Sequence, residues 1–305
     1  MVDSLDQTSD LAGIEIASHA LHAVVIRGGT VVKTYSYRIT ESQESIQELI
    51  TLIEELKSDL SGLERIGIAV PGLVDSNTGR VAFSAHIPLH SAIDMANVVK
   101  TATGIEAVIE NDANAAAYGE YKLGSGRGSR NLFYATLGEG VGGAFIFDGK
   151  LWRGAAGYAG EFGYVTINSE GTRLEDVASS ENILRRTRSR FHQDSTSSLK
   201  RLSEEAITLR EIITAAEKED DFAQMMLERT GVYVGTAIAS VINLLNIEKI
   251  IIGGEIMEAK SLVLDAIRDR ARELAFEPNF DSASIVEGDL GENAASVGAA
   301  LLSSS

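Results

Sequence analysis

Glu110, Asn111 and Asp112 form the first segment whose residue types suggest proton-transfer chemistry. They follow the β-prone run 107–109 and precede a stretch of helical composition that begins near Ala113. Asp112 is therefore expected at the carboxyl end of a strand and at a helix N-terminus, where α/β sheets bind ligands. Two interpretations stay open: a carboxylate that acts as a general base, and an ordinary helix cap worth about 1 kcal/mol.

A glycine-rich segment at 138–143 reads Gly-Glu-Gly-Val-Gly-Gly and lies between two runs with the composition of strands. Glycines let backbone N–H groups approach an anion closely, so one interpretation is a phosphate-binding loop. The other is a tight β-turn with glycines at positive φ. Two more carboxylates follow, Glu161 within the glycine-rich segment 157–163 and Glu175 near a helix start. Solvation and helix-end stabilisation are the alternative explanations for these two.

The composition excludes several kinds of site. The chain has no cysteine, which rules out disulfides, thiolate metal sites and a cysteine nucleophile. Among the five histidines, His86 and His90 are four residues apart, but Pro88 between them disfavours a regular helix. No histidine pair has the context of a metal site, so we expect no structural zinc. The Gly-x-x-x-x-Gly-Lys-Ser/Thr pattern of P-loop enzymes is also absent from the sequence.

The chain of 305 residues is acidic, with 27 Lys+Arg against 44 Asp+Glu and a formal net charge of −17. Because like charges repel, we expect neither nucleic acid nor an anionic membrane as a partner. The N-terminal residues lack the basic and apolar parts of a signal peptide. The longest weakly polar stretch, 231–247, contains Thr236 and Asn243 and is interpreted as a buried core helix rather than a membrane span. A cytoplasmic location is therefore expected.

The order of the expected elements repeats along the chain. Three β-rich runs open it, followed by a helix with apolar residues at helical spacing and a short buried strand. These elements are expected at 11–17, 21–27, 31–38, 45–60 and 65–70. Strand, turn, strand, glycine turn, strand recurs about 120 residues later, at 132–137, 142–147 and from 150 onward. Such repetition predicts two related α/β lobes that face each other across a cleft.

The last third of the chain completes the pattern. A charged helical stretch runs over 173–219 and contains serine-rich loops. A long helix, a strand, a helix and a short helix rich in alanine and glycine follow. They are expected at 222–247, 249–252, 261–275 and 293–302.

Taken together and in order, these segments resemble the ROK family of repressors, open reading frames and sugar kinases. The resemblance covers about residues 12–302 and rests on GIAVPGLVDSNTGRV, ENDANAAAYGE, NLFYATLGEGVGGAFIFDGKLWRGAAGYAGEFGYVTI, IIIGGEI and ENAASVGAALL. It implies the two-lobed, actin-like and hexokinase-like ATPase fold, an α/β class with duplicated βββαβα lobes and a central cleft. The smaller lobe would hold 1–117 and 292–305, and the larger lobe, with the dimerisation helices, would hold 118–291.

The resemblance also implies roles residue by residue. Asp112 matches the general base that accepts the proton of a sugar hydroxyl as this hydroxyl attacks the γ-phosphate of ATP. Asn111, Glu161 and Glu175 match sugar ligands, and the sugar side also includes His86 and Tyr164. The positions that match the nucleotide side are Glu15, Gly138, Glu139, Gly140, Gly142, Gly253 and Gly254.

Several positions depart from the family pattern. The first phosphate loop of the family reads Asp-x-Gly-Gly-Thr-Lys, whereas residues 15–20 read Glu-Ile-Ala-Ser-His-Ala. Glu139 replaces the threonine of the second loop, and a carboxylate there repels phosphate unless a metal ion intervenes. Part of the net charge, at Glu15 and Glu139, thus falls where phosphate would lie. Tyr164 replaces the zinc-binding histidine, the cysteine motif is missing, and His86-Ile87 stands for the family's Asn-Leu.

The resemblance implies a glucokinase-like sugar kinase that transfers the γ-phosphate of ATP to a hexose or N-acetylhexosamine, with Mg²⁺ and without zinc. The altered phosphate loops favour an alternative, a catalytically impaired sugar- or metabolite-binding regulatory protein. A DNA-binding repressor is not expected, because only about ten residues precede the first strand and the chain is acidic. A small-molecule sugar is the expected ligand, and a homodimer through the larger lobe is the expected assembly.

Overall fold

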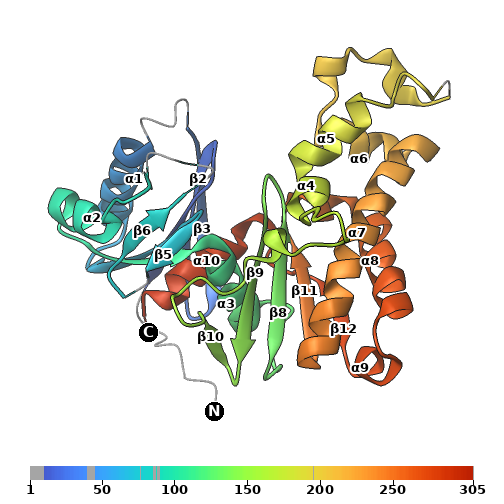
Figure 1. The fold of residues 1–305 in the computed structure, drawn as a ribbon. Helices are drawn as coiled ribbons and strands as arrows, with labels where there is room; N and C mark the ends of the chain where they lie inside the picture. Colours follow the sequence, from blue (N-terminus) through green and yellow to red (C-terminus); the bar gives the residue numbers. More distant parts are fainter. Residues whose placement is uncertain are drawn as a thin grey trace. The chain divides into compact units, whose positions relative to one another are not determined.

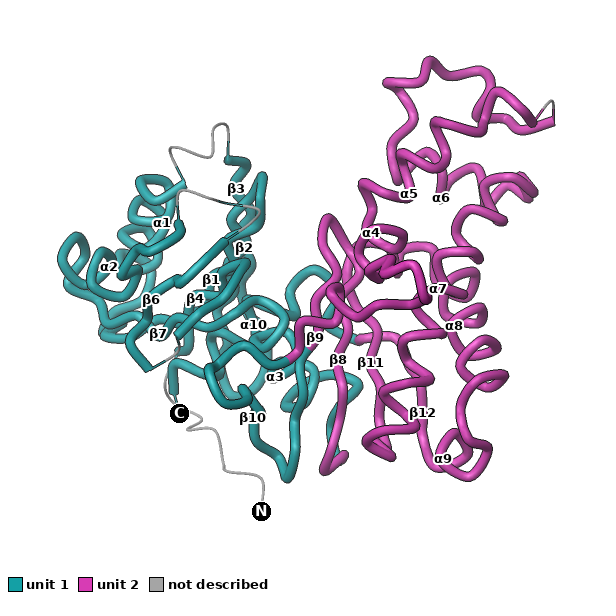
Figure 2. Tube along the Cα trace, viewed as in Figure 1, with its two compact units in different colours: residues 1–128, 144–159, 289–305 teal, residues 129–143, 160–288 magenta. Residues whose placement is uncertain are grey.

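The chain divides into two units, coloured separately in Figure 2. Unit 1 contains residues 1–128, 144–159 and 289–305, and unit 2 contains residues 129–143 and 160–288. The computed structural model describes residues 10–39, 45–75, 77–84, 87, 90–194 and 196–304. The lobe boundaries that the resemblance implies, after 117 and after 291, stay a prediction.

A five-stranded sheet with the order β3-β2-β1-β4-β7 forms the centre of unit 1 (Figure 1). Its strands are β1 (Leu11–Ile16), β2 (Ala20–Arg27), β3 (Thr30–Arg38), β4 (Arg65–Val70) and β7 (Glu106–Asn111). The first three are antiparallel, whereas β4 and β7 run parallel to β1. The parallel strands therefore end at one edge of the sheet, where β7 delivers Asn111. A separate antiparallel pair consists of β5 (Leu73–Asp75) and β6 (Arg80–Phe83).

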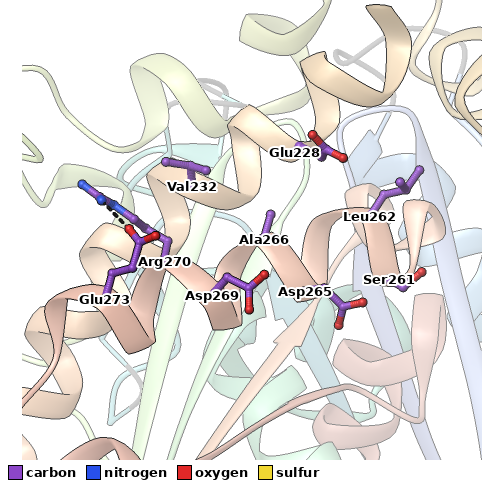
Figure 3. A pocket seen from close by; sticks show the side chains of 9 residues that line it. All are labelled: Glu228, Val232, Ser261, Leu262, Asp265, Ala266, Asp269, Arg270 and Glu273. Atoms are coloured by element: carbon purple, nitrogen blue, oxygen red, sulfur yellow. Dashed lines mark hydrogen bonds and ion pairs between the residues drawn. The ribbon is translucent and has the colours of Figure 1, made fainter. Parts of the chain in front are cut away.

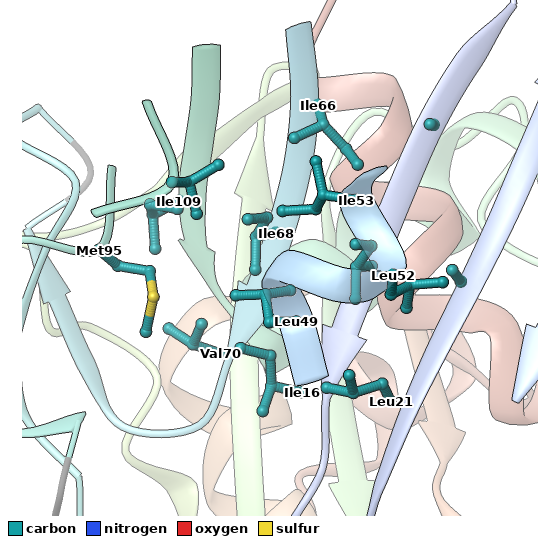
Figure 4. Close-up of a cluster of buried hydrophobic side chains, with 14 of the residues drawn as sticks. Ile16, Leu21, Leu49, Leu52, Ile53, Ile66, Ile68, Val70, Met95 and Ile109 are labelled. Carbon is teal, nitrogen blue, oxygen red and sulfur yellow. The ribbon is translucent and has the colours of Figure 1, made fainter. Parts of the chain in front are cut away.

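The sheet of unit 1 is covered on both faces. On one face, alternate strand residues such as Ile66 and Ile68 pack with Leu49 and Ile53 in a fully buried cluster (Figure 4). The helices there are α1 (Ser45–Asp59) and α2 (Met95–Thr103). On the other face, Val24 packs against the last helix of the chain. The helices on that side are α3 (Asp112–Leu123) and α10 (Ala294–Leu302).

Small residues let α10 lie directly on the sheet and on α3. A Cβ atom added at Gly298 would overlap the carbonyl oxygen of Ala115 in α3. One added at Gly67 of β4 would overlap the backbone of Ala299 in α10. Backbone therefore meets backbone along α10, and the glycines are required by this close approach rather than by a turn. The alanine- and glycine-rich composition of the last segment is explained by this contact.

We predict that Gly298→Ala destabilises the protein by about 3 kcal/mol, because the new methyl group forces α3 and α10 apart. Gly62→Ala is the control: Gly62 has open space around it and a φ of 88°, so only backbone strain of about 1–2 kcal/mol is expected. Urea unfolding of both variants measures the difference. Equal losses for the two substitutions would contradict the packing argument.

The second sheet has the order β10-β9-β8-β11-β12. Its strands are β8 (Leu132–Leu137), β9 (Val141–Phe147), β10 (Lys150–Trp152), β11 (Lys249–Gly253) and β12 (Ser284–Glu287). Unit 2 adds the helices α4 (Glu175–Ala178), α5 (Ser180–Arg188), α6 (Leu209–Glu217), α7 (Asp221–Leu245), α8 (Ser261–Leu274) and α9 (Glu277–Asp281). A Cβ atom at Gly231 of α7 would overlap α8, so these two helices also meet closely.

Both sheets have three antiparallel strands followed by two parallel ones in the same order, which confirms the predicted repeat. The helix expected at 222–247 is α7, which ends at Asn246 in the left-handed conformation. Its stretch 231–247 was interpreted as a buried core helix, but only one face of it is buried and Leu244 is 82% exposed. In the described part of the chain, no helix has the length and apolarity needed to cross a membrane.

Candidate functional site

Asp112 is the first residue of α3, directly after the end of β7, as the sequence predicted. The cap of this helix is Asn111, whose side-chain oxygen accepts a hydrogen bond of 3.0 Å from the backbone N–H of Asn114. One carboxylate oxygen of Asp112, Oδ1, accepts bonds from Asn111 Nδ2 at 2.9 Å and from Ala113 N at 2.8 Å. The capping role therefore falls to Asn111, and these bonds hold the Asp112 carboxylate in a fixed orientation.

Behind this pair lies a buried ion pair between Glu110 and Arg153. Glu110 is 3% exposed, and its Oε1 accepts hydrogen bonds of 3.0 Å from Asn111 N and from Asn114 Nδ2. Its Oε2 accepts from Arg153 Nε at 2.9 Å and from Nη2 at 2.5 Å. Such a charge-assisted fork is strong and directional. Arg153 thus fixes the residues that orient Asp112.

Sequence reasoning missed this ion pair. Glu110 belongs to ENDANAAAYGE and Arg153 to the segment LWRGAAG, but 43 residues separate them. No rule of local residue spacing connects two side chains that lie so far apart in the sequence. The only signal was that a glutamate precedes the Asn-Asp pair, directly after the β-prone run 107–109.

Arg153→Met is predicted to destabilise unit 1 by about 2–3 kcal/mol, because it leaves the buried Glu110 carboxylate without its cation. Arg27→Met is the matched control, since Arg27 forms the same kind of fork with Asp10 but at an exposed position. Exposed pairs contribute about 0–1 kcal/mol. Chemical unfolding compares the two variants. A loss at Arg153 as small as that at Arg27 would contradict the assigned role.

Glu15 lies at the carboxyl end of β1, near Asp112 and Glu292. Burial, together with the neighbouring carboxylates of Asp112 and Glu292, raises its pKa to about 8. The side chain is therefore mostly neutral at pH 7. At pH 7 Glu15 therefore contributes little of the negative charge that the sequence places at this position.

Replacement of Glu15 by Gln should remove a pH dependence of stability. Between about pH 4.5 and 8, the unfolded chain loses the Glu15 proton while the folded protein keeps it, so the free energy of unfolding falls as pH rises. Glu15→Gln is therefore expected to stabilise the protein more at pH 8 than at pH 5 in urea titrations. Glu64→Gln, at an exposed site in unit 1, serves as control. An equal effect of Glu15→Gln at both pH values would refute the assignment.

The turn that follows Glu15 occupies the place of the family's first phosphate loop. Its Ala17 N–H donates a hydrogen bond of 2.9 Å to the carbonyl oxygen of Ala20. A backbone donor at this turn is therefore already used within the chain. This geometry agrees with the loss of the glycines that would open the loop to an anion.

In unit 2, the second glycine loop meets the turn after β11. Gly138 donates a backbone bond of 2.9 Å to Gly140 O, and Gly138 O accepts one of 2.8 Å from Ser180 N. Gly254 has a φ of 92°, and a Cβ atom there would overlap the carbonyl oxygen of Leu137. Only glycine fits this position, so the matched nucleotide-side residues Gly138, Gly140 and Gly254 lie close together. Gly253 ends β11 and Gly142 lies in β9.

Carboxylates gather around this loop. Burial raises the pKa of Glu255, and the nearby Glu139 and Glu258 raise it as well, whereas a hydrogen bond with Ser180 lowers it. A cavity of about 420 Å³ is lined by Leu209, Arg210, Glu255 and Glu258. A second carboxyl group, that of Glu255, therefore lies near Glu139, and its raised pKa favours the neutral form.

Glu175 and the segment around Glu161 form a third part of the candidate site, also in unit 2. Glu175 Oε2 accepts a bond of 3.0 Å from Val141 N, which ties it to the second glycine loop. Gly163 lies against Glu175, so a side chain there would disturb the segment that carries Glu161. Glu161 itself is exposed, immediately before the short 3₁₀ helix Phe162–Tyr164. Glu175 is thus a positioning residue for the loop as well as a candidate ligand.

The segment that replaces the family's cysteine motif is closed by hydrogen bonds. Ile167 N donates to Thr172 O at 3.0 Å, and Asn168 Nδ2 donates to the Thr172 hydroxyl at 3.0 Å. Tyr164, in place of the family's histidine, is 57% exposed and lies beneath the Arg173 guanidinium, 4.9 Å from the ring centre. The hydrogen bonds of this short hairpin hold the segment in place without a metal ligand.

His86 lies outside the described residues. Within the described ranges, no group of three or more His, Cys, Asp or Glu residues is arranged to hold a metal ion. A groove of about 500 Å³ over α7 and α8 is lined by nine residues, four of which are acidic (Figure 3). Its residues are Glu228, Val232, Ser261, Leu262, Asp265, Ala266, Asp269, Arg270 and Glu273.

Residues 11–305 match the model of the ROK family, and the chain belongs to this family. The relatives of this chain include both kinases and regulators. Glucokinase of Halalkalibacterium halodurans is 31% identical over 270 residues, covering 85% of this chain and 81% of that protein. The xylose repressor of Bacillus subtilis is 25% identical over 301 residues, covering 94% of this chain and 74% of the repressor.

Solved structures give the same two classes. A ROK family glucokinase from Streptomyces griseus, in complex with glucose and AMPPNP, superposes with a TM-score of 0.88 at 27% identity over 97% of this chain and 99% of that chain. A ROK family transcriptional regulator, a homologue of the E. coli MLC protein, has a TM-score of 0.86 at 29% identity over 97% of this chain and 78% of its own. These matches establish the actin-like hexokinase fold.

Proposed function

We propose that this protein is a glucokinase-like sugar kinase that transfers the γ-phosphate of ATP to a hydroxyl group of a hexose or N-acetylhexosamine. The observation that carries the proposal is the Asp112 carboxylate, which is oriented by Asn111 and Ala113 and not consumed as the helix cap. The glucose and AMPPNP bound to the Streptomyces griseus relative support the choice of substrates.

In this proposal Asp112 removes the proton of the attacking hydroxyl. The N-terminus of α3 stabilises its charged form, and the bonds to Oδ1 fix the direction of the carboxylate. Asn111, Glu161 and Glu175 are the proposed ligands of the sugar hydroxyls, and Tyr164 and His86 are further candidates. Sugar recognition needs several donors and acceptors in a fixed array.

The nucleotide contacts Gly138, Gly140, Gly142, Gly253 and Gly254. Bound Mg²⁺ would neutralise phosphate charge, and the oxygen ligands that it prefers are present in Glu139 and Glu255. Glu15, being mostly neutral at pH 7, adds little repulsion on its side. We also propose a cytoplasmic homodimer that forms through the lobe that the resemblance places at residues 118–291.

A second candidate is a sugar-binding regulator with weak or no use of ATP. It is favoured by the closed turn after Glu15 and by the raised pKa of Glu255 beside Glu139. The similarity to xylose repressors supports this candidate as well. The two candidates share a sugar site and differ in phosphate transfer.

Asp112→Asn distinguishes them. We expect calorimetry with a panel of hexoses and N-acetylhexosamines to find one that binds wild type and variant within about tenfold of each other. ADP release with Mg-ATP should fall by about 10²–10⁴-fold in the variant, since a general base is lost. Asp221→Asn is the matched control, because Asp221 is also the first residue of a helix that its neighbour Asp220 caps.

Three outcomes of this experiment distinguish the kinase from the regulator. Turnover retained in Asp112→Asn would refute the role of the base. Sugar binding without detectable nucleotide binding at millimolar ATP would refute the kinase and leave the regulator. Failure to bind any sugar of the panel would exclude both the kinase and the regulator.

A further inference from the structure

Five arginines gather where α5 ends and where α7 passes it. They are Arg185, Arg186, Arg188, Arg190 and Arg229. None of them takes part in an ion pair with a carboxylate of the described residues. Two of them nevertheless lie near carboxylates, since Arg185 helps to lower the pKa of Asp176 and Arg188 that of Glu205. We call the five residues the arginine cluster.

Helix-end stabilisation explains two members of the arginine cluster. The side chain of Arg185 reaches the carbonyl oxygen of Asp176 at 3.5 Å and also bonds Asn182. Arg188 donates to the carbonyl oxygen of Ile207 at 2.8 Å. Cations near a helix C-terminus bind free carbonyl groups and interact favourably with the helix dipole. Arg186 makes no contact of this kind and needs another explanation.

Arg186 is buried, with only 9% of its surface exposed. One nitrogen, Nη2, donates to the Thr230 hydroxyl at 2.8 Å, and the guanidinium lies 5.6 Å from the ring centre of Tyr233. Its Nε and Nη1 atoms are buried without a hydrogen-bond partner in the described structure. A buried guanidinium with unsatisfied N–H groups and no counter-ion is strongly unfavourable unless a ligand completes it.

The neighbouring arginines make the burial of the Arg186 charge less favourable still. Burial is the main cause that lowers the pKa of Arg186 to about 10; Tyr233 opposes this shift, and the cations Arg229, Arg190 and Arg185 add to it. These three arginines are exposed and lie around the buried one. They create a local positive potential in an acidic protein.

We propose that the arginine cluster is a binding site for a phosphate group, supplied by inorganic phosphate or by a phosphomonoester such as a hexose phosphate. A phosphate group carries nearly two charges and several acceptor oxygens, which suit one buried and three exposed guanidinium groups better than a single carboxylate does. The long-range repulsion of the whole chain disfavours extended polyanions, so a small ligand fits best. None of the residues assigned to sugar or ATP belongs to this site.

Arg186→Met tests the site in two ways. In phosphate-free buffer the variant should have an equal or higher Tm than wild type, because an uncompensated buried charge is gone. Added phosphate should raise the Tm of wild type and not that of the variant. Arg270→Met is the matched control: Arg270 also bonds a threonine of α7, Thr236, but has a carboxylate partner in Glu273.

Calorimetry with inorganic phosphate, with glucose 6-phosphate and with potassium chloride at equal ionic strength identifies the source of the phosphate group. Arg229→Gln, at an exposed position, should keep the fold and weaken binding by about tenfold. This variant decides the question if Arg186→Met does not fold. Absence of phosphate binding at about 10 mM, or equal affinity in wild type, Arg186→Met and Arg229→Gln, would overturn the proposal.

Discussion

The close approach of α10 to α3 is the contact on which unit 1 depends. Gly298 meets the Ala115 carbonyl, and Gly67 of β4 meets the backbone of Ala299, so the last helix of the chain locks onto both the sheet and α3. Because α3 carries Asp112 at its N-terminus, the candidate base is positioned by residues far along the sequence. A change of one methyl group in α10 is felt at the candidate site through rigid packing.

The negative charge of carboxylate side chains is compensated differently in the two units. In unit 1, Arg153 compensates Glu110 and burial keeps Glu15 mostly protonated at pH 7, so Asp112 is the carboxylate that can carry the reactive charge. In unit 2, burial and the nearby Glu139 raise the pKa of Glu255, and Arg210 lines the same cavity as Glu255. The proposed kinase would therefore need a bound cation at its phosphate side, whereas the proposed regulator would not.

Much of the fold could be predicted from local patterns, and the decisive side-chain pairs could not. Alternating and helical apolar spacing placed β1, β2, β3, α1, β8 and α7 to within about two residues, because these elements bury one regular face. The short pair β5 and β6 and the helix α2 lack such long runs and were not predicted. Asp112 was found from its strand-to-helix position. The partners Glu110–Arg153 and Arg186–Thr230 are more than 40 residues apart, and only the fold brings them together.

The central claim is that Asp112 serves phosphate transfer to a sugar. Phosphorus NMR of the protein with Mg-ATP and the sugar that calorimetry selects observes this transfer directly. The account predicts a growing sugar phosphomonoester signal in step with the formation of ADP. ADP and free phosphate without an ester, or an unchanged ATP spectrum at saturating sugar, would contradict it.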